Sequence, residues 1–204
     1  MQDIQSDGIT YVLGKEIVLL DACVLYSAVL RDLLMQLTSD RMFRARWTQK
    51  IQAEWSEKLL KNNPTVSREN VSRTLWCMDN MDTNQENRII TGYDHLIDEL
   101  ALPDANDRHV LAAAIRGQAT IILTYNTRDF PEEYVLRFGI KIRTPDNFLV
   151  ELLTLNTEKF CAAIRTIRSR LRKPRKLASE YLDSLAKQRI PKTVSVLRNN
   201  EQFL

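Results

Sequence analysis

Three acidic residues stand at positions that a parallel sheet would bring together. Asp21 directly follows the apolar run 17–20, whose composition is typical of a strand buried on both faces. Asp129 follows a second apolar run, 120–124, and Asp107 opens the helical pattern that leads into that run. The carboxyl ends of parallel strands share one edge of the sheet, where ligand crevices form. We therefore expect these carboxylates to meet at that edge.

A cluster of carboxylates predicts a particular chemistry. Neighbouring carboxylates repel one another and raise one another's pKa unless a cation lies between them. An all-oxygen set of ligands suits Mg²⁺ or Mn²⁺ rather than zinc, and such ions complete their shell with water or a substrate phosphate. A cation of this kind lowers the pKa of a bound water. The pattern therefore favours metal-assisted hydrolysis of a phosphodiester.

Each acid also has a structural explanation. Asp21 would cap a helix that begins after the first strand, and Asp129 would stabilise a turn. Glu54 lies in the middle of a helical pattern, where a solvated helix face accounts for it. Asp104 and Asp107 have D-x-x-D spacing at a helix start, which suits the helix dipole, and for Asp104 we favour this capping role. The shared position of Asp21, Asp107 and Asp129 is what favours a functional role for them.

The elements that would position these acids alternate along the chain. Apolar strands alternate with amphipathic helices over residues 17–153, which predicts an α/β fold with a parallel central sheet flanked by helices. Beyond residue 156 only helical patterns occur. The expected strands are 17–20, 42–47, 88–91, 120–124 and 140–142, and the expected helices are 24–37, 49–61 (capped by Thr48), 67–81, 93–100, 103–116, 131–138, 145–153, 157–172, 178–187 and a short one after Pro191.

We divide the chain into three parts by pattern and charge. Residues 1–16 form a leader with a short pairing segment around 11–13, residues 17–153 carry the acids, and residues 154–204 form a basic helical extension. Residues 1–140 contain 15 Lys and Arg against 20 Asp and Glu, whereas residues 141–204 contain 14 against 6. This excess of basic residues has three candidate explanations: a solvated helix face, a surface that binds RNA phosphates, or a surface that binds an acidic protein partner. The patch is Arg165, Arg168, Arg172, Lys173, Arg175 and Lys176.

Composition excludes several classes of protein. The three cysteines are widely spaced and form no C-x-x-C pair, and there are only two histidines, so we expect a reducing compartment and no zinc site. No apolar run approaches the ~20 residues that span a bilayer. The N-terminus carries acids rather than the basic and apolar regions of a signal peptide. We expect a cytoplasmic protein with no membrane contact.

Four blocks in this order resemble the PIN-domain nucleases, and among them the VapC-type toxins of bacterial type II toxin–antitoxin pairs. The blocks are IVLLDACVLYSA (17–28), WTQKIQAEW (47–55), PDANDRHVLAAA (103–114) and IILTYNTRDF (121–130). The resemblance implies a PIN-like fold for 17–153 and a cognate antitoxin as partner. It implies catalytic roles for Asp21, Glu54, Asp107 and Asp129, with Asp21, Asp107 and Asp129 as metal ligands and Asp104 as an extra acid.

Substrate contacts are expected from polar residues near the strand ends. Asn126 and Arg128 lie in the loop after the second apolar strand, and Arg128 is our preferred phosphate contact. Many family members have D-x-N at the first acid, whereas this chain has Cys23, so Ser27 one turn further along is a candidate replacement. We expect Cys23 to be buried by packing rather than to act as a nucleophile, because no histidine lies near it in the sequence.

The expected function is therefore a Mg²⁺- or Mn²⁺-dependent endoribonuclease that acts as a toxin, with a homodimer as one candidate assembly. A catalytically weak PIN-like module that binds RNA or protein is the alternative, kept open by Cys23 and opposed by the presence of all four acids. A phosphatase or dehalogenase would place a second aspartate two residues after Asp21, where this chain has cysteine. A response-regulator receiver would place a lysine after a late core strand, and none follows in that way.

Overall fold

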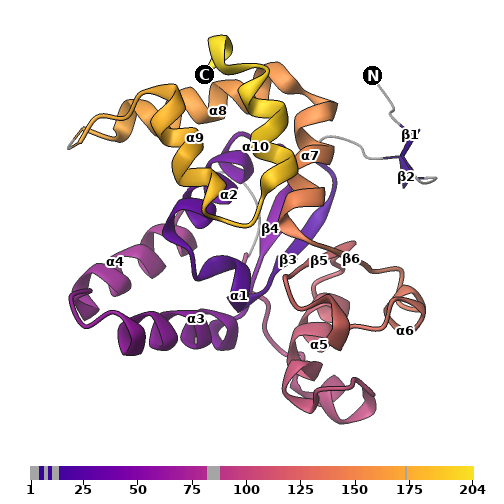
Figure 1. Cartoon of the computed structure of the whole chain (residues 1–204). Coiled ribbons are helices and arrows are strands. Elements are labelled where there is room, and N and C mark those ends of the chain that lie inside the picture. The colour runs from indigo at the N-terminus through magenta and orange to yellow at the C-terminus, as the bar shows by residue number, and fades with distance from the viewer. Residues whose placement is uncertain (1–4, 7–8, 11–13, 82–87, 173) are drawn as a thin grey trace.

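A four-stranded parallel sheet lies at the centre of the computed structural model (Figure 1). The structure describes residues 5–6, 9–10, 14–81, 88–172 and 174–204. The strands are β3 (Ile17–Leu20), β4 (Arg44–Arg46), β5 (Ile121–Leu123) and β6 (Lys141–Arg143), in the order β4-β3-β5-β6. All three pairings are parallel. The predicted α/β class with a parallel, helix-flanked sheet is therefore confirmed.

The two middle strands form the floor of the core. Val18, Leu19 and Leu20 of β3 have no exposed surface, and Ile122 and Leu123 of β5 are equally buried. The register pairs Leu19 with Ile122 and Leu20 with Leu123, so both strands end together. This is the arrangement expected of continuous apolar runs covered by helices on both faces. It places Asp21 and Thr124 side by side, immediately after the two strands.

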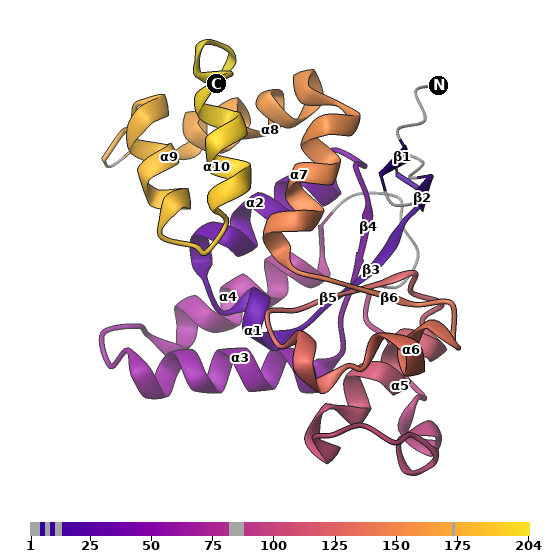
Figure 2. The ribbon, with the colours of Figure 1, turned by 45° about the vertical axis from the view of Figure 1, so that its right-hand side comes forward.

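The helices follow the predicted order closely. Thr48 and Ser67 cap their helices by accepting hydrogen bonds from Ile51 N and Asn70 N, which confirms two predicted starts. The C-terminal helices lie together above the sheet in Figures 1 and 2, whereas α3 and α4 lie below it on one side and α5 on the other. The bounds are α3 Gln49–Asn62, α4 Arg68–Asp79, α5 Arg108–Arg116, α6 Glu132–Leu136, α7 Pro145–Leu155, α8 Thr157–Arg170, α9 Ala178–Ala186 and α10 Pro191–Arg198.

The predicted helix 24–37 is wrong as a single element. The structure has a short α1 (Ala22–Leu25) and then α2 (Ala28–Ser39), separated at Tyr26 and Ser27. Ser27 has an extended backbone and caps α2, accepting a hydrogen bond from Leu30 N at 3.3 Å. A serine that can satisfy a free N–H begins a new helix at low cost, which the apolar periodicity alone does not reveal.

Three other segments differ from the prediction in detail. The strand expected at 88–91 is a single parallel bridge between Trp47 and Ile89. The segment expected to be helical at 93–100 is a 3₁₀ turn, Asp94–Glu99, and the start of the helix expected at 103–116 is another, Ala105–Asp107. Two further 3₁₀ turns cover Thr127–Asp129 and Glu201–Phe203. Near the N-terminus β1 (Gln5–Ser6) pairs antiparallel with β2 (Ile9–Thr10). The pairing segment predicted around 11–13 lies outside the described residues.

After residue 144 every regular element in the described part of the chain is helical, as predicted. The boundaries proposed at 16/17 and 153/154 stay predictions. Among the described residues, no helix is long and apolar enough to cross a bilayer.

Candidate active site

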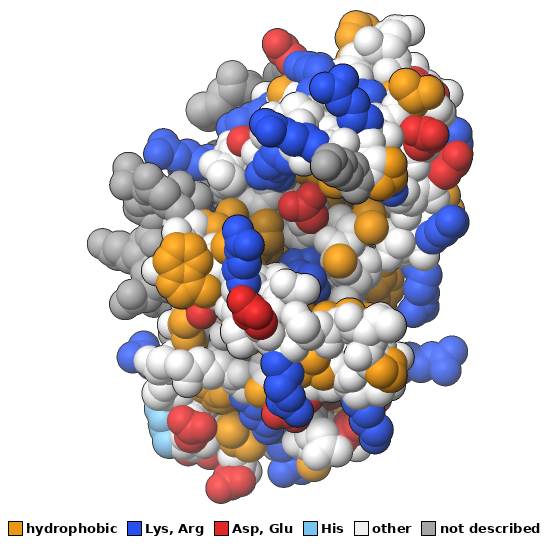
Figure 3. Space-filling model, turned by 90° about the vertical axis from the view of Figure 1, so that its left-hand side faces the viewer, with side chains coloured by type: hydrophobic (Ala, Val, Ile, Leu, Met, Phe, Trp, Pro, Cys, Tyr) orange, Lys and Arg blue, Asp and Glu red, His pale blue; other side chains and the backbone are white. Residues whose placement is uncertain are grey.

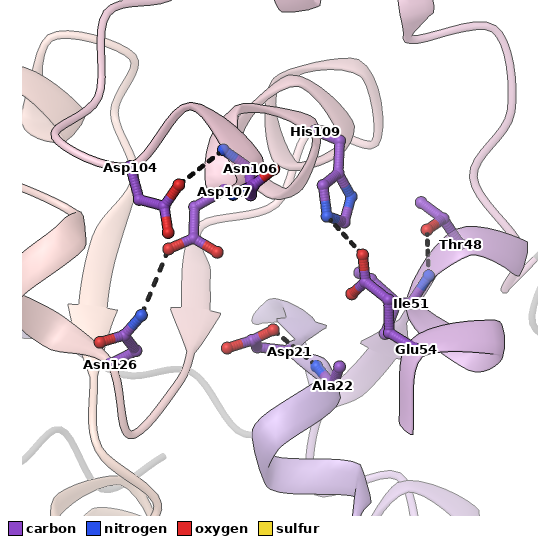
Figure 4. Close-up of polar contacts among 10 residues, drawn as sticks. All are labelled: Asp21, Ala22, Thr48, Ile51, Glu54, Asp104, Asn106, Asp107, His109 and Asn126. Atoms are coloured by element: carbon purple, nitrogen blue, oxygen red, sulfur yellow. Dashed lines mark hydrogen bonds and ion pairs between the residues drawn. The ribbon is translucent and has the colours of Figure 1, made fainter. Parts of the chain in front are cut away.

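Acidic side chains from three separate elements line one pocket at the carboxyl edge of the sheet. The pocket has a volume of about 450 Å³. Asp21 comes from the end of β3, Glu54 from α3 and Asp107 from the start of α5, and Asn126 from the loop after β5 completes the acidic side. Figure 4 shows their side chains converging on a common space. The structure thus brings together four of the residues that the sequence predicted for the site.

Asp21 is held in place by three donors. Its Oδ1 accepts a hydrogen bond from Ala22 N at 2.6 Å, and its Oδ2 accepts one from the Thr124 hydroxyl at 2.7 Å and one from the Cys23 thiol at 3.0 Å. Only 8% of its surface is exposed. Asp21 therefore caps α1 and faces the pocket at once, so its structural and functional explanations are compatible.

The prediction that Cys23 is buried is wrong. The residue is exposed and lines the acid pocket, because α1 begins directly after Asp21 and turns this side chain back toward the carboxylate. Although the residue as a whole is exposed, its sulfur lies against Asp21 and Thr124. The resulting loss of hydration, followed by the charge of Asp21, raises the pKa of Cys23 to about 12. The thiol therefore stays protonated, which suits a hydrogen-bond donor and opposes a role as nucleophile.

Negative charge is crowded around Asp107 in the pocket, and the pKa of this residue is shifted. Its pKa is raised to about 6, first by partial burial and then by the charges of Asp21, Asp104 and Asp129, while His109 acts in the opposite direction. Its Oδ2 accepts a hydrogen bond from Asn126 Nδ2 at 3.2 Å. Because like charges raise one another's pKa, a cation placed among these groups would be favourable.

The raised pKa of Asp107 predicts a pH dependence of stability. In the metal-free protein, the folded state should bind more protons than the unfolded chain between about pH 4 and pH 6, so stability should fall as the pH rises through that window. Asp107→Asn should remove much of this fall and raise the melting temperature at neutral pH. Thermal unfolding in EDTA at several pH values measures both effects. If the melting temperature of the wild type falls with pH no more steeply than that of Asp107→Asn, the crowding of negative charge around Asp107 is contradicted.

Glu54 is paired with a buried histidine that the sequence analysis did not single out. His109 Nε2 lies 3.0 Å from Glu54 Oε1, and the His109 side chain is almost fully buried. The side chain of Glu54 remains 39% exposed toward the pocket. His109 thus fixes the orientation of the Glu54 carboxylate. The one feature of the sequence that could have indicated a role for His109 was its position two residues after Asp107.

Other predicted site residues lie nearby without lining this pocket. Asp129 and Asp104 are close enough to raise the pKa of Asp107, and Asp104 accepts a hydrogen bond from Asn106 N at 2.8 Å, as the capping prediction required. Arg128 is exposed and does not line the pocket. The Ser27 hydroxyl donates to Gln188 Oε1 while capping α2, so its oxygen and proton are both engaged within the chain.

The donor set fits a hard cation that keeps part of its water. Within the described ranges, no three His, Cys, Asp or Glu side chains converge closely enough to form a ready metal group. The pocket instead offers separate carboxylates, Asp21 and Asp107, with an amide from Asn126. Magnesium is commonly bound in this open way, by one or two carboxylates together with water and substrate phosphate rather than by an all-protein cage.

The predicted basic patch is partly committed to holding the C-terminal helices together. Arg165 donates to Phe203 O, Arg168 donates to Leu204 O and Lys176 O, and Lys176 Nζ donates to Ser184. Arg172 and Arg175 stay exposed beside a hollow of about 670 Å³. Figure 3 shows basic side chains gathered over the upper part of the molecule, where these helices lie. Lys173 lies outside the described residues.

Two family models match this chain, one over its central region and one over its C-terminal region. The PIN domain family model matches residues 17–128, more than half of the sequence, and the VapC50 C-terminal domain model matches residues 145–199. A curated protein of Mycobacterium tuberculosis named "Putative ribonuclease VapC50" is 38% identical over 82 residues, which cover 40% of this chain and 48% of that protein. The match thus spans about half the length of the relative. No solved structure matches significantly.

The site and the comparisons agree on the family. The PIN domain match contains Asp21, Glu54 and Asp107, which the fold brings to one pocket from three elements. It also contains the parallel strands β3 and β5 that carry Asp21 and Asn126 to the same edge. The chain belongs to the PIN-domain family.

Proposed function

We propose that this chain is a divalent-metal-dependent endoribonuclease that acts as the toxin of a toxin–antitoxin pair. The observation that carries the proposal is the meeting of Asp21, Glu54 and Asp107 in one pocket, where partial burial and then neighbouring negative charges raise the pKa of Asp107 to about 6. Membership of the PIN family and a relative whose name contains the word ribonuclease support it.

PIN-domain nucleases generally use a divalent metal ion, and Mg²⁺ or Mn²⁺ is the ion proposed here. Asp21 and Asp107 would hold it, with Asp129 as a further ligand. When bound, such an ion supplies a water of lowered pKa and positive charge that stabilises the transition state at phosphorus.

The residues of the chain have separate tasks in this proposal. Asp21 is fixed by three donors, so its carboxylate is oriented before any ligand arrives. Asn126 orients Asp107 from the neighbouring loop. Glu54, held by His109, would accept a proton from the attacking water at its carboxylate. Preorganised groups of this kind contribute because they need not rearrange during the reaction.

An antitoxin partner is proposed from the resemblance to VapC-type toxins. Arg172 and Arg175 are exposed basic side chains in the segment between α8 and α9, and they would suit either RNA phosphates or an acidic segment of a partner. A homodimer stays a prediction.

Removal of the metal is the direct test. Cleavage of end-labelled single-stranded RNA and of a tRNA pool should disappear in EDTA and return on addition of Mg²⁺ or Mn²⁺, because the ion would supply the activated water and the positive charge at phosphorus. Gel analysis of the fragments measures both steps. Cleavage that persists in EDTA would contradict the proposal. If the protein binds RNA but cleaves none of the substrates with either metal, the alternative of a PIN-like binding module is favoured. Cys23, which stands where many family members have the asparagine of D-x-N, is the feature that keeps this alternative open.

A further inference from the structure

The pocket has a second wall that carries no carboxylate. Tyr26, Lys58 and Asn62 line this side. Lys58 and Asn62 follow Glu54 at intervals of four residues on α3, so all three project from the same helix face. We propose that this wall is a subsite for the RNA nucleotide next to the bond that is cut. The inference rests on the proposed nuclease function and names how that site holds its substrate.

Hydrogen bonds fix the wall in place without a ligand. The Tyr26 hydroxyl accepts hydrogen bonds from Asn62 Nδ2 at 3.4 Å and Asn63 Nδ2 at 3.3 Å, which join the α1–α2 junction to the end of α3. Arg31 makes a second link, because it donates to Leu25 O at 2.6 Å and lies 4.3 Å above the Trp55 ring. A preformed wall avoids part of the ordering cost of binding.

Lys58 has a positive charge that the fold leaves unpaired. A glutamate four residues before a lysine normally pairs with it on a helix. Here the Glu54 carboxylate is bound to His109 instead, and within the described part of the chain Lys58 makes no hydrogen bond or ion pair. It is also the one basic residue among those that line the pocket in the described structure. Its ammonium group is therefore available to a phosphate.

Tyr26 supplies the groups that a base requires. The Tyr26 side chain is half-buried and lines the pocket, so its ring is the aromatic surface there on which a base would stack. Among the described residues its hydroxyl accepts hydrogen bonds and donates none, so its proton is free for a base or ribose acceptor. Stacking on an aromatic ring tolerates any sequence, because every base has a π-face. An unstacked, single-stranded nucleotide presents both the base and the phosphate that this wall can bind.

The position of Lys58 along α3 places its charge beside the acids rather than among them. Lys58 lies four residues, about 6 Å along the helix axis, from Glu54. A phosphate neighbouring the scissile one would thus reach Lys58 while the scissile phosphate lies among the acids. An acidic peptide fits less well, because it would place negative charge beside Asp21, Glu54 and Asp107 and would provide no base for the Tyr26 ring.

A matched pair of lysines on one helix tests the subsite. Lys61 is exposed on α3 and does not line the pocket, so Lys61→Gln removes the same charge from the same helix. Binding of a fluorescent single-stranded RNA hexanucleotide would be measured by anisotropy with the full chain in Ca²⁺, with gels to show that the RNA stays intact. We expect Lys58→Gln to weaken binding about tenfold and to flatten the slope of log affinity against log salt by about 0.7, the value for one phosphate contact on a single strand.

The controls separate the subsite from the proposed nuclease function. Lys61→Gln should stay within twofold of wild type, Tyr26→Phe should keep most of the affinity and Tyr26→Leu should lose it, with melting temperatures to show that each variant is folded. Equal losses for the two lysine variants, or no loss for Lys58→Gln, would overturn the subsite even if RNA is cleaved normally. If the variants show the expected binding pattern but the protein cleaves no RNA, the nucleotide-binding wall is supported and the proposed nuclease function is wrong.

Discussion

Asp21→Asn should lower kcat/KM for RNA cleavage by roughly a thousandfold or more. A metal ion contributes several kcal/mol to transition-state stabilisation, and each 1.36 kcal/mol corresponds to a factor of ten in rate. Asparagine keeps an oxygen that can accept from Ala22 N, but it removes the charge and places an amide where Cys23 and Thr124 now donate to Oδ2. The fold should survive while the metal affinity is lost.

Two controls make this result specific. Cys23→Ser keeps a donor beside Asp21 and should change kcat/KM far less than Asp21→Asn. Metal binding itself can be followed without RNA, because Mn²⁺ should raise the melting temperature of the wild type and not that of Asp21→Asn. A variant that cleaves at the wild-type rate, with EDTA still inhibiting, would show that the ion is held by other groups.

The acidic side of the site was predictable because its residues are fixed by local sequence and by the sheet. Asp21 follows an apolar run whose composition is typical of a buried strand, and Asp107 begins the helix before the second such strand. Once the strands are parallel, topology alone brings these positions to one edge. Glu54 was placed by resemblance, since nothing in its helix distinguishes it from a solvated glutamate.

The wall formed by Tyr26, Lys58 and Asn62 was not predictable because it depends on how helices pack against one another. Lys58 looks like the ordinary partner of Glu54, and only the approach of α5, which brings His109 to Glu54, leaves it unpaired. The division of the predicted helix 24–37 has a similar origin. Ser27 caps α2 and also donates to Gln188 in the turn between α9 and α10, a contact across 161 residues. Periodicity within a helix carries no information about such contacts.

The same turn joins the C-terminal helices to the rim of the acidic site. The Tyr125 hydroxyl donates to Gln188 O at 2.6 Å, and the Arg189 guanidinium lies 4.6 Å from the Tyr125 ring centre. Tyr125 N in turn donates to the sulfur of Cys23. The position of the loop that carries Asn126 therefore depends on the packing of α9 and α10, which makes the stability of those helices relevant to the site.

Asp146→Ala should destabilise the protein by about 3 kcal/mol. The helix α10 begins with Pro191 and has no side-chain cap of its own. Its cap comes from α7, because the buried carboxylate of Asp146 accepts hydrogen bonds from Lys192 N at 3.0 Å, Thr193 N at 2.9 Å and the Thr193 hydroxyl at 2.8 Å. Alanine would leave these donors without that acceptor, at a cost of about 1–3 kcal/mol for each buried group that stays unsatisfied.

Urea denaturation of two alanine variants on the C-terminal helices measures this contribution. Asp183→Ala removes an exposed ion pair with Arg198, whose atoms lie 2.7 Å apart, and should cost less than about 1 kcal/mol because solvent screens such pairs. Asp146→Asn keeps one acceptor oxygen and should fall between the two alanine variants. A loss for Asp146→Ala no larger than that for Asp183→Ala would mean that α10 is held by its buried side chains, Val194 and Leu197, and that the carboxylate merely fills a site that water would satisfy equally well.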